Sequence, residues 1–291
     1  MADAPFAVAA DLHAHTTVSD GTDTPAELVA AASAAGLGAL AITDHDSTAG
    51  WSEAIDAARR HGIGLIPGIE LSTREQFTSV HVLGYLIDPT DEALLAETAR
   101  IRDSRLTRAE AIVRRIAADY DLTWDDVLAQ TSDGATIGRP HIADALVARG
   151  HASTRSDAFA GILHWRSGYA QPHYAPDPLT GIRLIRAAGG VPVLAHPGTR
   201  GAEDVVPDRR LARLAASGLF GLEVDHPENT DAAKPRLREL ARRHGLAITG
   251  SSDYHGRGKV NRLGQYTTAP EVVARILAEG HGSPPVLPGS P

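Results

Sequence analysis

Near its N-terminus the chain reads Asp11-Leu12-His13-Ala14-His15, followed by Ser19-Asp20-Gly21. This motif directly follows a short apolar run, residues 6–10, which is typical of a buried strand. Side chains alternate across a strand, so His13 and His15 point to the same side and can reach one ion. Imidazole and carboxylate ligands together suit Zn, Fe or Mn better than Mg. Two histidines on one strand face can also simply be packed or solvated, so the motif needs support from elsewhere in the chain.

That support comes from the ends of other apolar, β-branched runs, where the same residue types recur. The further candidates are His45 after 40–42, Glu70 after 63–69, His81 within 80–82, His196 after 191–194, and Asp253 and His255 after 246–248. In barrel-type α/β proteins, the loops at the carboxyl ends of the strands converge on one mouth. Histidines and acids gathered at such ends are hard to explain by packing, so we interpret them as a metal cluster.

Other histidines fit structural roles. His61 and His244 both stand in Arg-Arg-His-Gly at the end of an alanine-rich helical stretch. A basic residue near a helix C-terminus, with glycine at the stop, is ordinary capping chemistry. His226, in Glu223-Val224-Asp225-His226-Pro227, also follows a strand-like run, but we leave it out of the predicted metal set.

Composition limits the possible functions. A chain of 291 residues is long enough for one elaborated domain or for a domain with an insertion. Its formal charge of −8 argues against a broad grip on duplex DNA, although it leaves a phosphate substrate open because metal ions supply positive charge locally. The absence of cysteine excludes disulfides and thiolate metal sites. We find no targeting segment and no run long enough to span a bilayer, so we expect a cytoplasmic protein.

Strand-like and helix-like segments alternate over most of the chain, which predicts an α/β fold. Seven strand-like runs, starting near residues 6, 37, 63, 80, 191, 220 and 246, favour a distorted parallel barrel with fewer than eight strands. The first helix is marked by Thr24 as N-cap, Pro25 at the first position and Glu27 completing a capping box. We therefore predict a discontinuous barrel (1–90 and 191–280), a helical insertion (91–190) and a disordered tail (281–291).

The motifs and their order resemble the PHP (polymerase and histidinol phosphatase) phosphoesterases. The insertion after His81 resembles the subgroup of nucleoside 3′,5′-bisphosphate phosphatases and 5′–3′ exoribonucleases. The resemblance implies a (β/α)7 barrel whose mouth holds two or three divalent metal ions, either Mn, Fe or Zn. It implies one ion on His13, His15, Glu70 and Asp253, a second on Glu70, His81 and His196, and a third on Asp20, His45 and His255.

This metal set implies a specific chemistry. Metal ions about 3.5–4 Å apart can share a hydroxide, generate it at neutral pH, and support an in-line displacement at phosphorus. No catalytic side chain beyond the metal site is then needed. We expect hydrolysis of nucleotide phosphate monoesters, of the 3′,5′-bisphosphate or 5′-nucleotide type, or removal of nucleotides from the 5′ end of short RNA.

Substrate-binding candidates lie in the predicted insertion and near His196. Arg139 and His141 stand at a helix N-terminus, which is a natural anion site, although Pro140 there also fits an ordinary first helical turn. Arg102 and Arg105 can hold a second phosphate or belong to a solvated helix face. Arg200 is a further candidate of the same kind.

Three alternatives remain open from the sequence. One is a phosphatase for histidinol phosphate or a sugar phosphate, which a substrate panel distinguishes. A second is a metal amidohydrolase on a barrel, but many of those bridge their metals with a carboxylated lysine, and Lys234 and Lys259 do not lie in suitable strand-like runs. The third is a non-catalytic metal-binding module, which predicts missing ligands where none is missing. The oligomeric state is not predicted.

Overall fold

The structure is a computed structural model and describes residues 10–76, 78–199 and 206–289. The strands are β1 (Ala10–Asp11), β2 (Ala39–Ile42), β3 (Gly64–Glu75), β4 (Thr78–Tyr85), β5 (Val191–Leu194), β6 (Gly221–Asp225) and β7 (Ala247–Gly250). The helices are α1 (Pro25–Ala34), α2 (Trp51–His61), α3 (Glu92–Ile116), α4 (Trp124–Leu128), α5 (Arg139–Ala148), α6 (Arg155–Ala160), α7 (Pro178–Ala187), α8 (Asp208–Ala216), α9 (Ala233–His244) and α10 (Pro270–Glu279), with a 3-10 turn η1 (Gly256–Gly258). In these ranges no helix has the length and apolar character that crossing a bilayer requires.

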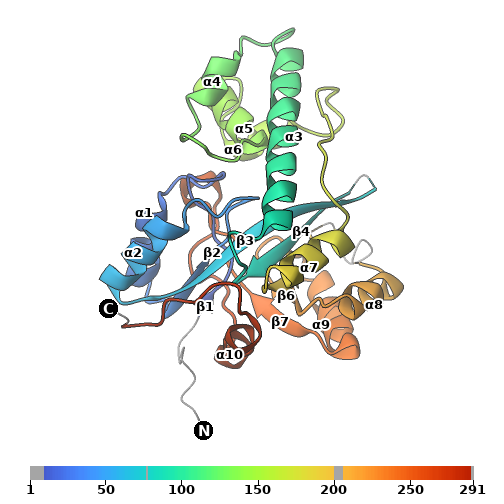
Figure 1. The fold of residues 1–291 in the computed structure, drawn as a ribbon. Helices are drawn as coiled ribbons and strands as arrows, with labels where there is room; N and C mark the ends of the chain where they lie inside the picture. The colour runs from blue at the N-terminus through green and yellow to red at the C-terminus, as the bar shows by residue number, and fades with distance from the viewer. Residues whose placement is uncertain (1–9, 77, 200–205, 290–291) are drawn as a thin grey trace.

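The strands form one curved sheet in the order β1-β2-β3-β4-β5-β6-β7. Its two edges meet beyond the strand ends, where Ala14 bridges to Tyr254 and the His15 amide donates to the Tyr254 carbonyl at 2.9 Å. Helices surround this nearly closed barrel, as Figure 1 shows. The predicted class, a distorted (β/α)7 barrel of α/β type, is confirmed.

One strand runs against the expected parallel direction. β4 pairs antiparallel with both β3 and β5, whereas the other neighbouring strands are parallel. A parallel connection needs a crossover of about a dozen residues or more. Here β3 extends to Glu75 and the chain reverses at once into Thr78, with Gln76 at a φ of 51°. The expectation of an all-parallel barrel was therefore wrong for β4.

Alternation along the strands divides the barrel's buried side chains into two groups. Ala41, Ile66 and Leu83 share a cluster with Val273 of α10, and Ile66 lies on the same strand face as Glu70. This cluster therefore fills the barrel interior below the cavity. The opposite strand faces, with Leu40 among them, pack against the surrounding helices. Apolar side chains therefore fill the barrel below its mouth, and the polar side chains of the interior gather at the mouth.

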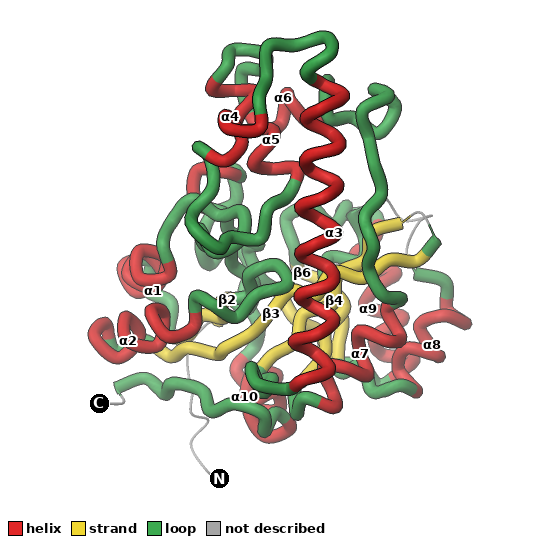
Figure 2. Tube along the Cα trace, turned by 45° about the horizontal axis from the view of Figure 1, so that its top comes forward, coloured by secondary structure: helices red, strands yellow, loops and turns green. Residues whose placement is uncertain are grey.

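The helices between residues 91 and 190 do not form one unit. The second half of α3 shares a separate hydrophobic cluster with α4, α5 and α6 that includes Ile112, Ile142 and Leu146, and this part stands above the barrel (Figures 1 and 2). The first half of α3 packs on the barrel core through Leu94 and Ile101. α7 instead packs through Ile182 and Ile185 against the barrel core. The barrel thus resumes at α7, before the expected boundary at residue 191. The division into a barrel and an insertion domain stays a prediction.

The segment around Val286 is packed against the barrel. The composition predicts a disordered tail at 281–291, of which residues 290–291 lie outside the described residues, yet Val286 forms an antiparallel bridge with Leu65, with backbone hydrogen bonds of 2.9 Å in both directions. The Val286 side chain is buried. Gly282 approaches the backbone of Ala188 and Asp88 so closely that a Cβ atom has no room. The proline-rich composition of this segment is typical of disorder. The first residues of β3, however, have an open edge, and the segment around Val286 covers it.

Removing this segment should destabilise the barrel. A chain ending at Ser283 loses both hydrogen bonds and the buried Val286 side chain, which predicts a loss of roughly 2–4 kcal/mol in the free energy of unfolding. A chain ending at Leu287 keeps the pairing and serves as the matched control. Urea unfolding followed by circular dichroism measures both. Equal midpoints for the two truncations would contradict the structural role of Val286.

Candidate metal centre

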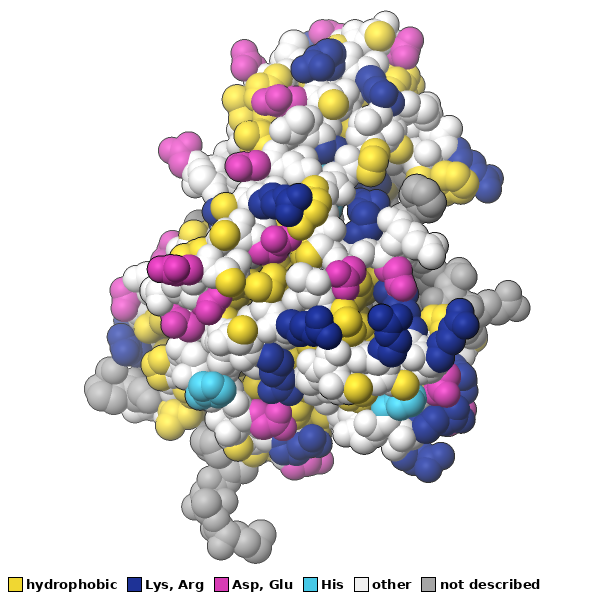
Figure 3. Space-filling view, turned by 45° about the vertical axis from the view of Figure 1, so that its right-hand side comes forward, with side chains coloured by type: hydrophobic (Ala, Val, Ile, Leu, Met, Phe, Trp, Pro, Cys, Tyr) yellow, Lys and Arg dark blue, Asp and Glu magenta, His cyan; other side chains and the backbone are white. Residues whose placement is uncertain are grey.

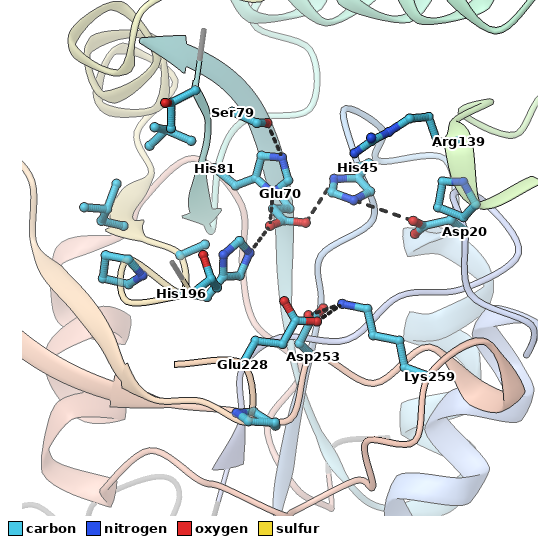
Figure 4. Close-up of a pocket in the computed structure, with 18 of the residues that line it drawn as sticks. Asp20, His45, Glu70, Ser79, His81, Arg139, His196, Glu228, Asp253 and Lys259 are labelled. Atoms are coloured by element: carbon cyan, nitrogen blue, oxygen red, sulfur yellow. Dashed lines mark hydrogen bonds and ion pairs between the residues drawn. The ribbon is translucent and has the colours of Figure 1, made fainter. Parts of the chain in front are cut away.

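Every strand of the barrel supplies a histidine or an acid to the same end. His13 and His15 follow β1, His45 follows β2, Glu70 lies in β3, His81 lies in β4, His196 follows β5, Glu223 lies in β6, and Asp253 and His255 follow β7. Asp20 joins them from the loop between β1 and α1. A cavity of about 1580 Å³ opens over this end, and most of these side chains line it (Figure 4). The nine predicted ligands therefore lie in one place.

The Glu70 carboxylate lies at the centre of the cluster. Its Oε1 lies 2.7 Å from Nδ1 of His81 and 3.0 Å from Nε2 of His196. Its Oε2 lies 3.0 Å from Nδ1 of His45 and 3.3 Å from Nε2 of His15. Burial would raise the pKa of Glu70, but the neighbouring imidazoles, His81 first, hold it well below its usual value. Each oxygen of Glu70 thus faces its own set of histidines.

The rings of His13 and His15 are oriented by their outer nitrogens. Nδ1 of His13 lies 3.0 Å from the Glu223 carboxylate, which can only accept, so this nitrogen carries the proton. Nδ1 of His15 lies 3.2 Å from the Ser19 hydroxyl, which itself donates to Asp44 at 2.6 Å. Nδ1 of His15 is therefore also the protonated nitrogen. In both neutral rings the lone pair of Nε2 points inward.

Only acceptors then meet at the centre. The two Nε2 atoms lie 3.1 Å apart, and Oδ1 of Asp253 lies 3.5 and 3.4 Å from them. Converging lone pairs repel unless they share a proton or a cation, and His and carboxylate oxygens are the donors that Zn, Fe and Mn accept. A proton can take the place of the cation, because hydrogen bonds to Asp253 and Glu70 outweigh the effect of burial, which lowers the pKa of His15, and raise it to about 9. The residues present therefore fit a divalent metal ion.

A second group of donors lies beside the first. Oδ1 of Asp20 lies 3.3 Å from Nε2 of His255, and its Oδ2 lies 3.8 Å from Nε2 of His45. Burial would raise the pKa of Asp20, but His255 and His45 hold it well below its usual value. Atoms of His15, Asp20 and His255, and those of His13, Glu70 and His196, form compact groups able to hold an ion.

Sequence reasoning missed three residues that the structure adds to this site. Glu223 accepts from His13 and from the His196 amide at 2.8 Å, and it is completely buried. His226 is also buried, with Nε2 3.4 Å from Oδ2 of Asp253. Lys259 donates to the same oxygen at 2.5 Å. A glutamate inside the apolar strand run 221–224 is unusual and could have indicated Glu223 from the sequence. His226 follows the same run but was left out of the predicted metal set.

The predicted substrate-binding residues divide into two groups. Arg139 and Arg105 line the cavity. Arg102 lies at a different, small cavity and donates to the Asp46 carbonyl at 3.2 Å. His141 lies buried in the first turn of α5, where its Nδ1 accepts from the Gly138 amide. These positions do not favour the anion role predicted for Arg102 and His141, because the side chains serve helix packing and capping. Arg200 lies outside the described residues.

The barrel and its cluster of histidines and carboxylates define a metal-dependent hydrolase class. The family model of the PHP domain matches residues 11–134. The chain is 34% identical over 258 residues to the 5′-3′ exoribonuclease Rnm of Escherichia coli, covering 88% of each chain. It is 33% identical over 272 residues to the 3′,5′-nucleoside bisphosphate phosphatase of Chromobacterium violaceum, covering 92% of this chain and 95% of the relative.

A solved structure agrees with these sequence matches. It is a protein of Bifidobacterium adolescentis assigned to the metal-dependent phosphoesterases, with 44% identity and a TM-score of 0.91, covering 94% of this chain and 97% of the other. The chain belongs to the PHP family and is a metal-dependent phosphoesterase.

Replacing Glu223 by glutamine should weaken metal binding. The amide still fills the space but no longer carries the charge that supports His13, and such outer partners affect metal affinity by roughly 10–100-fold. Titration against a chelator of known affinity measures the change. Glu239→Gln, at an exposed position on α9, is the matched control. Unchanged metal affinity in Glu223→Gln would contradict an orienting role for this carboxylate.

Proposed function

We propose that this phosphoesterase holds two or three divalent ions, Mn, Fe or Zn, and hydrolyses terminal phosphate monoesters of nucleotides. The substrates are nucleoside 3′,5′-bisphosphates, 5′-nucleotides or the 5′ ends of short RNA. The observation that carries the proposal is the Glu70 carboxylate, which has one oxygen facing His81 and His196 and the other facing His15 and His45. A carboxylate in this position is suited to bridging two ions.

We assign the ions to the ligand sets predicted from the sequence. One ion would lie on His13, His15, Glu70 and Asp253, a second on Glu70, His81 and His196, and a third on Asp20, His45 and His255. When bound, such ions supply a nucleophile at neutral pH and stabilise negative charge at phosphorus. Three carboxylates neutralise only part of the charge of two or three divalent ions. The remaining positive charge favours a dianionic phosphate over a neutral amide.

A cluster of arginines on the wall of the cavity supports a substrate with a second anionic group. Arg105, Arg108 and Arg139 line this wall together with His173, and Figure 3 shows basic side chains in the recess where the insertion meets the barrel. Arg108 is buried and its Nε has no hydrogen-bond partner among the described residues. Burial, followed by the charges of Arg105 and Arg139, lowers the pKa of Arg108 well below its usual value.

Buried like charges of this kind repel one another and favour binding of an anion. Asp46 neutralises Arg105 through an ion pair of 2.9 Å, but Arg108 and Arg139 have no carboxylate partner among the described residues. A phosphate is the natural counter-ion for arginine, which binds it through two parallel hydrogen bonds. The relatives that act on nucleoside bisphosphate and on RNA have substrates with more than one phosphate, which agrees with two anion sites.

Metal removal and a substrate panel test the proposed function. We expect phosphate release from AMP or adenosine 3′,5′-bisphosphate, or nucleotide release from the 5′ end of a short 5′-phosphorylated RNA, abolished by chelation and restored by Mn²⁺. Histidinol phosphate and the diester bis(p-nitrophenyl) phosphate report on the competing substrate classes. Metal analysis of the same samples gives the stoichiometry. Full metal content together with no release of phosphate or nucleotide from any nucleotide substrate in the panel would overturn the proposal.

Replacing Arg139 by alanine should weaken substrate binding without loss of metal. Removing one charged hydrogen-bond donor to a phosphate corresponds to a rise in KM of roughly 10–100-fold, with metal content unchanged. The control is Arg166→Ala, because the Arg166 guanidinium stacks on the Trp165 ring and does not line the cavity. Steady-state kinetics with adenosine 3′,5′-bisphosphate measures both variants. Parental kinetics in Arg139→Ala would remove this arginine from the anion site.

A further inference from the structure

The loop after β7 holds a lysine at the edge of the metal centre. Asn261 anchors this loop, because its side-chain amide donates to the carbonyls of Ser252 and Asp253 at 2.9 and 3.2 Å. Gly258 packs directly against the Arg155 guanidinium, where a Cβ atom would collide. The loop is thus fixed both at its end and in its middle. Lys259 lies between these two fixed points, and its side chain lines the cavity (Figure 4).

The Lys259 ammonium has one hydrogen more than its protein partners use. Its Nζ donates to Oδ2 of Asp253 at 2.5 Å and to Oε1 of Glu228 at 2.8 Å. Among the described residues these are its only hydrogen bonds, whereas an ammonium has three donors. The side chain remains 30% exposed, on the cavity side. The third N–H is therefore available to a ligand in the cavity.

Lys259 and the metal site use different oxygens of Asp253. Oδ1 faces the imidazoles, 3.5 Å from Nε2 of His13 and 3.4 Å from Nδ1 of His255. Oδ2 faces Lys259 and, at 3.4 Å, Nε2 of His226. The lysine contact with Oδ2 therefore leaves Oδ1 free to bind an ion.

We propose that Lys259 binds a non-bridging oxygen of the scissile phosphate with its third N–H, and that Glu228 holds the ammonium in place. The inference rests on the proposed function, since it names a protein contact to the phosphate at the same centre. No bond to phosphorus is made or broken by the lysine. Its charge adds to that of the metal ions, and its position beside Asp253 puts it within reach of a group bound there.

A purely structural lysine would also neutralise Asp253 and Glu228, and the two roles have different consequences. If the ammonium only supports Asp253, its loss should lower metal content. If it contacts the phosphate, its loss should weaken phosphate binding while the metal content stays that of the parent. Glu228→Ala separates the roles further, because it keeps the contact of the ammonium with Asp253 and removes only the second acceptor, which positions it.

The test uses the metal-loaded full chain and inorganic phosphate as the probe. Phosphate affinity is measured by calorimetry, metal content by elemental analysis and folding by thermal melting. We expect Lys259→Met to bind phosphate roughly 10–100-fold more weakly at parental metal content, with Lys259→Arg recovering part of the loss. Glu228→Ala, which removes the acceptor that holds the ammonium, should also weaken phosphate binding, by a smaller factor and at parental metal content. Lys234→Met, at the chain's other lysine, is the matched control, because Lys234 contacts Tyr266 and Asp231 outside the cavity lining.

Two results would overturn the proposal. One is parental phosphate affinity in Lys259→Met, and the other is loss of metal from that variant, which assigns the lysine to support of Asp253. If the methionine variant does not fold, Lys259→Gln is measured against the same two criteria. Because the probe is phosphate itself, the result does not depend on which ester the enzyme hydrolyses. Failure of the nucleotide panel would therefore leave this test intact.

Discussion

The buried carboxylate of Glu70 is the interaction on which the arrangement of the barrel mouth depends. An ionised carboxylate without partners is very costly to bury, so its neighbours must supply positive charge. Imidazoles that follow or belong to β1, β2, β4 and β5 surround it within 3.5 Å. Each of these strands must end at the right height for its ring to reach the same group. The carboxylate therefore constrains the register of strands that are far apart in the sequence.

This convergence requires unusual backbone conformations at the strand ends. His196 and Asp253 both have positive φ values, 29° and 51°, which non-glycine residues rarely adopt. Such conformations cost on the order of 1–3 kcal/mol each and persist only where surrounding contacts fix them. Glu223 accepts from the His196 amide, and Asn261 donates to the Asp253 carbonyl. The residues around the ligands thus hold both the ring orientations and the strained backbone.

Much of this site is predictable from the sequence because ligands stand at fixed points relative to strands. Eight of the nine predicted side chains lie together because the parallel strands that they belong to or follow bring their carboxyl ends to one edge. His81 reaches the same edge from the first half of the antiparallel strand β4. Lys259 and the direction of β4 were not predictable in this way. Lys259 lies in a loop without periodicity, and its place depends on close packing at Gly258 and on Asn261. The direction of β4 depends on the length of β3, which local pattern does not determine.

The insertion is tied to the metal centre through Asp46, the residue that follows the predicted ligand His45. The buried Asp46 carboxylate accepts from the amide and hydroxyl of Ser72, both at 2.7 Å, and pairs with Arg105 of α3 at 2.9 Å. Breaking a buried pair by removing one partner costs roughly 3–5 kcal/mol, so α3 does not slide freely over the barrel. The cluster of arginines on the cavity wall is therefore fixed relative to Glu70, which lies two residues before Ser72 on β3. If both sites bind phosphate as proposed, selection among phosphate esters depends on the spacing between the two anionic groups of the substrate.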